Sequence, residues 1–410
     1  METKNKLMMA VIVALVSFFA LTGCLERVEI NKLGLVTGVG IDKDGDNYIL
    51  TVQILNPAAI SGQNQNALPV YNLKADGRSI HEAFSKVGQI SSSALFLSHI
   101  NVIVINEEFA EAGFAPLLNF ALRHAEIRPD ISIVVAKDNT ANEILSVVTA
   151  LDIIPAAQLN VSQMVASHTA RLTNYNFYEV VDMVNNKTMN LVLNAVNIYH
   201  EEAHLEEEIE HKDGVTGVNK SKGSTIDNIL DISEPVQLRI EHLAVFNNDK
   251  LVGFLDTDEA QLYNMVIGEP KRYIYVAILE DEYYTSVRIP KAETKITTDL
   301  ANNQATIKMD LTAIILENTY PLDLTNQNNL RTISKQITDQ FEETMEEFVT
   351  RVQTELKSDI FGIGGKAYYH ENEIWKELSG YWNDLFPDIE IKLEIEVTID
   401  SVGEIGNVTL

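Results

Sequence analysis

Residues 33–55 read LGLVTGVGIDKDGDNYILTVQIL and form the stretch of sequence that decides how the folded part of the chain begins. Leu33 to Ile41 is a run of small and apolar residues, which is typical of a buried strand. Residues 42–47 follow with an Asp-Gly pair, the strongest short signal for a tight turn. Tyr48 to Leu55 is again rich in β-forming residues. The stretch therefore predicts a β-hairpin.

Strand and helix patterns alternate after this hairpin. Apolar strands are expected at Ile100 to Ile105 and Ile131 to Ala136. Helices are expected from Ser79 to about Gln89 and, interrupted by a glycine and a proline, from Glu107 to His124. Such alternation is typical of a mixed sheet with helices on at least one face. We interpret residues 24–200 as an N-terminal α/β domain.

The C-terminal third contains the longest helical pattern. Apolar residues recur at spacings of three and four from Leu330 to Leu356, which predicts one amphipathic helix of about eight turns. A glycine-rich stretch at Phe361 to Gly365 is expected to break the helix, and Ile389 to Ile399 alternates as a final strand. These patterns predict an α+β domain over residues 301–410. Its long helix covers the domain's own sheet or offers its apolar face to a partner, and we favour the first alternative.

Two segments separate these parts. Residues 201–235 are acidic, contain glycines and have little apolar content, so they are interpreted as a flexible linker or insertion. A second hairpin pattern, Val236 to Phe246 and Leu251 to Leu255, opens a small β-rich middle domain over residues 236–300. The predicted fold class is α+β, a multi-domain mixed α/β protein of sheets with packed helices and three domains.

The N-terminus has the features of an export signal. Lys4 and Lys6 precede an uncharged apolar run from Leu7 to Leu21, which is 15 residues long, whereas a spanning helix needs about 20. We interpret residues 1–23 as a signal peptide. It ends in Leu-Thr-Gly before Cys24, a sequence that resembles the bacterial lipobox, in which the cysteine carries a diacylglycerol. Cys24 is the only cysteine, so no disulfide can form within the chain.

The charge of the chain limits its partners. It has 31 Lys and Arg against 59 Asp and Glu, a formal net charge of −28. Nucleic-acid binding needs basic patches that displace counterions from phosphates, so this function is excluded. An anionic membrane surface would repel the chain. Membrane attachment must therefore come from acyl chains such as palmitate on Cys24.

Sequence motifs of known enzymes and metal sites are missing. The spacing of the glycines between Gly34 and Gly40 is not that of a dinucleotide-binding loop, and a turn follows instead of a helix. His81, His99, His124 and His168 form no pair with metal-ligand spacing on one face. We therefore assign no catalytic, cofactor-binding or metal-binding residue, expect no cofactor, and predict that the protein is not an enzyme. The assigned site is the lipidation site.

Several segments in their order along the chain carry a resemblance to a known family. After the lipobox the chain resembles the Ger(x)C spore-germination lipoproteins, although Cys24-Leu25-Glu26-Arg27 replaces a start that is commonly Cys-Trp-Asp-Arg in that family. The resemblance extends over the following segments: Arg27 to Lys43, Leu97 to Ile100, Asn119 to Pro129, Ala244 to Leu255, and Asp359 to Gly362 through Trp375 and Trp382 to Pro387.

The resemblance implies a role that the residues alone do not give. Ger(x)C proteins are the C subunits of nutrient germinant receptors, with three α/β domains and no enzymatic activity. They are anchored by lipid at the outer face of the spore inner membrane and assemble with the integral membrane A and B subunits. The alternative is a solute-binding lipoprotein of an importer. The fading of the strand-helix alternation after about residue 200 weighs against this alternative, because such proteins have two α/β lobes.

Replacement of Cys24 by alanine is expected to move the protein from the membrane fraction to the soluble fraction, because the diacylglycerol loses its attachment point. Membrane fractionation and mass spectrometry of the N-terminal peptide measure this change. The matched control is Glu26→Gln, which should remain membrane-bound. A Cys24→Ala protein that stays in the membrane fraction with its lipid retained would contradict the assignment.

Overall fold

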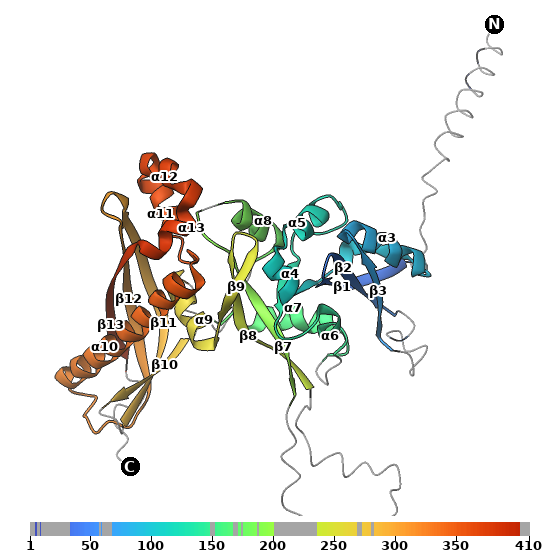
Figure 1. The fold of residues 1–410 in the computed structure, drawn as a ribbon. Helices are drawn as coiled ribbons and strands as arrows, with labels where there is room; N and C mark the ends of the chain where they lie inside the picture. The colour runs from blue at the N-terminus through green and yellow to red at the C-terminus, as the bar shows by residue number, and fades with distance from the viewer. Residues whose placement is uncertain are drawn as a thin grey trace, which may run out of the picture.

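The computed structural model describes residues 33–56, 68–147, 152–166, 171–173, 175–186, 188–200, 236–268, 273–279 and 283–401, with isolated residues at 5, 9 and 59. Within these ranges the chain forms two β-sheets with helices packed against them (Figure 1). The predicted mixed α/β fold of sheets and packed helices is confirmed.

The first sheet has nine strands and the second has four. The first sheet contains β1 (Leu33–Asp44), β2 (Asn47–Leu55), β3 (Val70–Gly77), β4 (Ala94–Phe96), β5 (Val102–Asn106), β6 (Ser132–Ala136), β7 (Val192–His200), β8 (Val236–Asn247) and β9 (Lys250–Leu255). Its helices are α3 (Ile80–Ile90), α4 (Glu107–Ala112), α5 (Ala115–Leu122), α6 (Ala141–Ile144), α7 (Pro155–Ala166) and α8 (Phe177–Asn185).

The second sheet contains the C-terminal strands. These are β10 (Tyr273–Leu279), β11 (Tyr283–Asp299), β12 (Gln304–Asn318) and β13 (Glu390–Ser401). The helices of this part are α10 (Gln327–Arg351), α11 (Ile363–His370), α12 (Asn372–Leu378) and α13 (Trp382–Leu385). Helix α9 (Thr257–Val266) connects the two sheets along the chain.

The order of strands in the first sheet is β3-β2-β1-β5-β6-β7-β8-β9, and β4 pairs with β1. β1 and β2 form the predicted hairpin, which closes where Asp44 pairs with Asn47. Gly45 in this turn has φ of 56°, a conformation that glycine adopts without steric cost. The central strands β1, β5, β6 and β7 are parallel, and antiparallel strands flank them on both sides.

Helices cover both faces of the first sheet. One face packs against α3, α4, α5 and α8 through a core that includes the fully buried Phe109 and Phe114. The other face packs against α6 and α7 through Leu145, Ala156 and Leu159. Because both faces are covered, the central strands read as continuous apolar runs instead of alternating ones.

Two glycines of β1 permit the close approach of α6 and α7. A Cβ on Gly38 would lie 2.8 Å from the Cβ of Ala156, and one on Gly40 would lie 3.0 Å from the Cβ of Ala141. Asp42, at the end of the same strand, accepts a hydrogen bond of 2.6 Å from the backbone N–H of Ala141. Burial raises the pKa of Asp42, and this hydrogen bond opposes the rise. The glycines therefore have a packing role, consistent with the absence of a dinucleotide motif.

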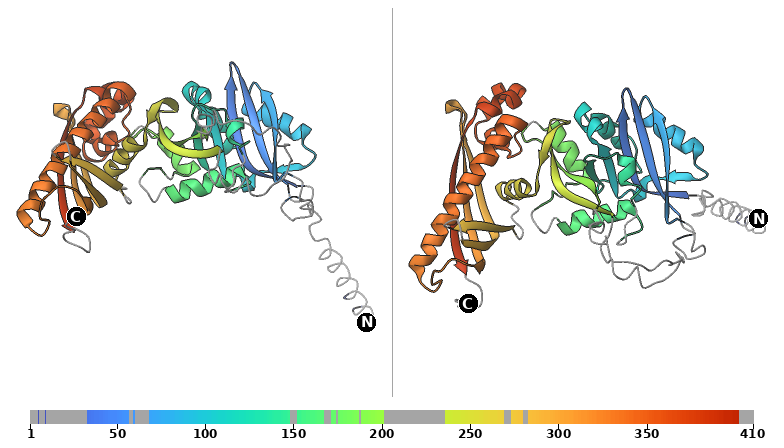
Figure 2. Two further views of the ribbon diagram at one scale, coloured as in Figure 1. Left: turned by 90° about the horizontal axis from the view of Figure 1, so that it is seen from below. Right: turned by 60° about the horizontal axis from the view of Figure 1, so that its bottom comes forward.

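The long helix predicted between Leu330 and Leu356 is confirmed. It is regular through α10 and continues as a π-helical segment, Val352–Leu356, before Lys357 ends it with φ of 48°. The break thus comes before the glycine-rich stretch at Phe361 to Gly365, which forms the start of α11. Figure 2 shows α10 running along one face of the second sheet. Its apolar stripe is buried in that sheet's core, the alternative that the sequence favoured.

Residues 236–300, expected as a β-rich middle domain, are divided between the two sheets. Their first hairpin, β8 and β9, extends the first sheet by pairing β8 with β7. Their last strands, β10 and β11, belong to the second sheet, where β11 pairs with β12. Without β8, strand β7 would leave a free hydrogen-bonding edge, and the hairpin covers it. Strand patterns do not reveal which sheet a hairpin joins.

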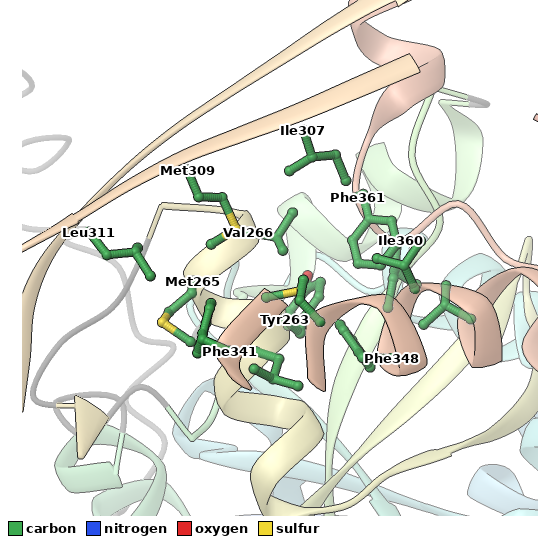
Figure 3. Close-up of a cluster of buried hydrophobic side chains, with 14 of the residues drawn as sticks. Tyr263, Met265, Val266, Ile307, Met309, Leu311, Phe341, Phe348, Ile360 and Phe361 are labelled. Atoms are coloured by element: carbon green, nitrogen blue, oxygen red, sulfur yellow. The ribbon is translucent and has the colours of Figure 1, made fainter. Parts of the chain in front are cut away.

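Helix α9 lies between the two sheets and, from Ala260 onward, is buried on every side. Asp256 caps its N-terminus in a capping box with Glu259. All residues from Ala260 to Val266 are buried, whereas a surface helix would leave one face exposed. Figure 3 shows Tyr263, Met265 and Val266 among side chains of β12 and α10. The same core includes Val192 and Leu243 of the first sheet, so the two sheets share one continuous core.

Tyr263→Ala is expected to lower the free energy of unfolding by about 3–5 kcal/mol, because the fully buried ring leaves a cavity between the sheets. Tyr263→Phe should lose only about 1 kcal/mol, since it removes only the 3.2 Å contact between the hydroxyl groups of Tyr263 and Tyr175. Urea denaturation followed by tryptophan fluorescence measures both changes.

The matched control for this experiment is Tyr369→Ala, whose ring is 78% exposed. Its free energy of unfolding should stay within about 0.5 kcal/mol of the unmodified protein. Equal destabilisation by the substitutions at Tyr263 and Tyr369 would contradict the conclusion that α9 belongs to a core shared by the two sheets.

Candidate functional site

The predicted lipidation site cannot be placed in the fold. Cys24, the signal peptide apart from residues 5 and 9, His168 and the acidic segment 201–235 all lie outside the described residues. Within the described ranges, no group of three or more His, Cys, Asp or Glu side chains is arranged to hold a metal ion. None of the helices within the same ranges has the length and apolar character needed to cross a bilayer.

The C-terminal segment that carried the resemblance is organised around a buried carboxylate. Asp359 is fully buried, and both of its oxygens accept hydrogen bonds. Oδ1 accepts from the backbone N–H groups of Gly362 at 2.9 Å and Ile363 at 3.0 Å. Oδ2 accepts from the backbone N–H of Gly364 at 2.7 Å and from the indole N–H of Trp382 at 2.9 Å. The carboxylate therefore satisfies the free N–H groups at the start of α11.

Steric constraints explain why glycines stand near Asp359. Gly362 has φ of 75°, which disfavours any residue with a side chain. A Cβ on Gly364 would lie 2.6 Å from the ring of Trp375 and 2.8 Å from Nε1 of Trp382. The two indole rings pack edge to face with centroids 5.0 Å apart. Residues that are separate in the sequence thus form one compact unit.

Burial and hydrogen bonding act on Asp359 in opposite directions. Burial raises the pKa of this carboxyl above its usual value, and the hydrogen bonds from Gly364, Trp382, Ile363 and Gly362 oppose that rise. All four partners are N–H donors. The four N–H groups can all donate to an ionised carboxylate. None of them can accept the hydrogen bond that a protonated carboxyl group would donate.

The same turn connects the two sheets. The backbone carbonyl of Asp359 accepts from the N–H of Asn190, at 2.8 Å, just before β7. The hydroxyl of Ser358 donates to the carbonyl of Phe246 in β8 at 2.6 Å. The side chain of Asn383 joins the junction, accepting from Asn190 at 3.0 Å. Asp359 therefore has two roles: its carboxylate holds the start of α11, and its backbone carbonyl contacts the first sheet.

An ion pair at the first turn of α9 also joins the two sheets. The guanidinium of Arg351, at the end of α10, contacts the carboxylate of Glu259 at 2.5 Å. It also donates to the carbonyl of Phe254 in β9 at 3.2 Å. Burial lowers the pKa of Arg351, but the hydrogen bonds and charges of Glu259 and Glu355 outweigh this effect and raise the pKa. Arg351 therefore links α9, α10 and the edge of the first sheet.

Two other segments that carried the resemblance meet near α3. The carboxylate of Glu126 accepts from the backbone N–H of Leu97 at 3.2 Å, which brings the two segments together. The ring of His124 packs on Phe120, with centroids 4.2 Å apart, and faces His81 at 5.5 Å. Spacing along the sequence does not reveal this histidine pair, because His81 lies on α3 and His124 follows the end of α5 more than 40 residues later.

These rings line a hollow of about 770 Å³ between α3 and α5. Among the described residues, its lining includes two arginines, two histidines and no carboxylate: Tyr48, Arg78, Ser79, Ile80, His81, Ala115, Pro116, Asn119, Phe120, Arg123 and His124. The hollow is a concave, positively charged surface on a chain whose net charge is −28.

Comparison with known families identifies the class of the chain. The family described as "Spore germination protein N-terminal domain" matches residues 26–198. The family described as "Spore germination B3/ GerAC like, C-terminal" matches residues 241–403. The protein therefore belongs to the Ger(x)C family of spore germination proteins, as the sequence resemblance indicated.

Similar proteins cover nearly the whole chain. Spore germination protein KC of Bacillus subtilis (strain 168) is 25% identical over 97% of this chain and 96% of its own length. Spore germination protein B3 of the same organism is 23% identical over 94% of this chain and 96% of its own length. The crystal structure of the GerBC protein superimposes with a TM-score of 0.53 at 16% identity, covering 88% of this chain and 97% of that one, which supports the fold.

Asp359→Asn is expected to lower the free energy of unfolding by about 3 kcal/mol or more, because an amide NH₂ group would face N–H donors in a buried site. Urea denaturation measures the loss. The exposed Asp339→Asn on α10 is the matched control and should unfold like the unmodified protein. Equal midpoints for the two variants would show that the carboxylate does not hold the junction.

Proposed function

We propose that this protein is a lipid-anchored, non-enzymatic subunit of a spore nutrient germinant receptor. The observation that carries the proposal is the ordered match of the two spore germination families over residues 26–198 and 241–403. The relatives named as spore germination proteins KC and B3 align over nearly their full lengths, so the comparison concerns the whole chain and not one shared module.

The lipid anchor is supported by the sequence at the end of the apolar run. Cys24 follows Leu-Thr-Gly and is the only cysteine. A diacylglycerol on its sulfur provides two acyl chains, which is sufficient for stable attachment to a bilayer. Export through the signal peptide would place the folded part on the outer face of the spore inner membrane.

Association with integral membrane proteins follows from this attachment. A tether confines the folded part near proteins in the same membrane and raises their effective concentration. We propose that the integral A and B subunits of the germinant receptor are the partners. The chain would contribute to the germination response by contact with these subunits and not by chemistry of its own.

The alternative of an importer's solute-binding lipoprotein is less consistent with the architecture. Ligands of such proteins bind between two α/β lobes. Here, within the part of the chain that the structure describes, the first sheet alone has helices on both faces, and the space between the two sheets is filled by α9 and its neighbours. The receptor role is therefore the better supported proposal.

Affinity purification of the tagged protein from detergent-solubilised spore membranes is expected to recover the integral A and B receptor subunits. Deletion of the gene should abolish the response to one nutrient class and leave nutrient-independent germination intact. An untagged strain controls for non-specific recovery. Recovery of an importer permease, together with a normal germination response in the deletion strain, would favour the solute-binding role instead.

A further inference from the structure

The hollow between α3 and α5 combines charge and aromatic surface in a way that the proposed receptor role does not require. Its volume of about 770 Å³ lies within the range of small-molecule sites. Arg78 and His81 come from the start of α3, whereas Arg123 and His124 come from the end of α5. Two segments about 40 residues apart thus direct four nitrogen-bearing side chains to one surface.

The hollow is positively charged, although the chain as a whole is strongly negative. The protein has nearly twice as many acidic as basic residues, 59 against 31, yet the described lining has no acidic residue. Two carboxylates bind the backbone of lining residues, and the charge of Glu82 also interacts with that of Arg78. Glu82 accepts from the backbone N–H of Arg78 at 3.0 Å and pairs with Lys86 at 3.0 Å, and Asp249 accepts from the N–H of Ala115 at 3.1 Å.

The arginines keep hydrogen-bonding capacity for a ligand. Nε of Arg123 donates to the side chain of Asn119 at 2.8 Å, an interaction that holds the guanidinium and leaves its terminal NH₂ groups without a hydrogen bond among the described residues. The guanidinium of Arg78 likewise has no hydrogen bond or ion pair within the described ranges. A planar guanidinium binds a carboxylate through two parallel hydrogen bonds.

The aromatic side of the hollow is ordered by its own contacts. Nδ1 of His124 lies 2.9 Å from the carbonyl of Phe120, and because a carbonyl only accepts, Nδ1 carries the hydrogen. Nε2 of the same ring is thus the nitrogen left for a ligand. Phe84 packs on Phe120 and His124 from behind, with centroids 5.7 Å and 5.6 Å away. The rings therefore form a fixed surface on which a planar group can stack.

We propose that the hollow between α3 and α5 binds a small organic carboxylate with an aromatic body. The guanidinium groups of Arg78 and Arg123 hold the carboxylate, and the rings of His81, Phe120 and His124 hold the aromatic part. Phosphate suits the site less well than an aromatic carboxylate, because it has no ring to stack on His81, Phe120 and His124.

Phenylacetate is the probe for this site, measured by isothermal titration calorimetry on the full chain purified in mild detergent. Saturable binding with a Kd below about 1 mM is expected. Arg78→Gln and Arg123→Gln should each weaken binding at least about tenfold, because each loses a charge-assisted pair of hydrogen bonds. Both residues are exposed, so the variants should keep the circular dichroism spectrum of the unmodified protein.

The controls separate charge, aromatic contact and position. Arg128→Gln removes an exposed arginine that pairs with Asp130 outside the hollow, and it should bind phenylacetate like the unmodified protein. Acetate, 2-phenylethanol and inorganic phosphate should each bind at least about tenfold more weakly than phenylacetate. Absence of saturable phenylacetate binding, equal binding by the Arg123→Gln and Arg128→Gln variants, or equal binding of phosphate would each overturn the proposal.

Failure of this inference is distinguishable from failure of the receptor role. Purification of receptor subunits with the Arg123→Gln variant should be unchanged, because the proposed association does not depend on this hollow. Binding of phenylacetate by the unmodified protein, its loss in the Arg123→Gln variant, and intact recovery of the A and B subunits by that variant support both proposals. Recovery of the subunits by an unmodified protein that does not bind phenylacetate removes only the ligand site.

Discussion

The buried carboxylate of Asp359 holds the start of α11 and Trp382, and the backbone carbonyl of the same residue joins this turn to the first sheet through Asn190. The carboxylate replaces the hydration that it loses on burial with four N–H donors, three from the backbone at the start of α11 and one from Trp382. An ion buried without such partners would be strongly unfavourable. The donors in turn would lose this acceptor without the carboxylate. This mutual requirement explains why Gly362, Gly364 and both tryptophans gather around one acid.

The junction between the two sheets extends through a shared hydrophobic core. Helix α9 is buried on every side from Ala260 onward, and its neighbours come from both sheets. The region matched by the C-terminal family begins at residue 241, yet β8 and β9 complete the sheet formed by the N-terminal region. The two regions are therefore interlocked through a common sheet as well as through packing. A ligand or partner that moves one sheet relative to the other would have to disturb this core.

Helix α7 illustrates where sequence patterns fail. It was not predicted, because its polar and apolar residues are placed opposite to the usual arrangement. Gln158 and Gln163 are buried, whereas Val161 and Met164 are more than half exposed. The buried amide of Gln163 is hydrogen-bonded through both of its polar atoms: it donates to the hydroxyl of Ser132 at 3.0 Å and accepts from Asn194 at 2.9 Å. A buried amide with distant partners cannot be distinguished from a surface amide in the sequence.

The sequence by itself determined the local elements of this protein and its family. The first hairpin and the long α10 follow from turn chemistry and periodicity, which act over a few residues. Only the tertiary structure decided that the hairpin 236–255 joins the first sheet, that Asp359 meets Asn190 and Trp382, and that His81 faces His124. The reason is physical: local patterns depend on neighbours along the chain, whereas a strand edge, a buried charge and a ring each find their partners from segments far apart in the sequence.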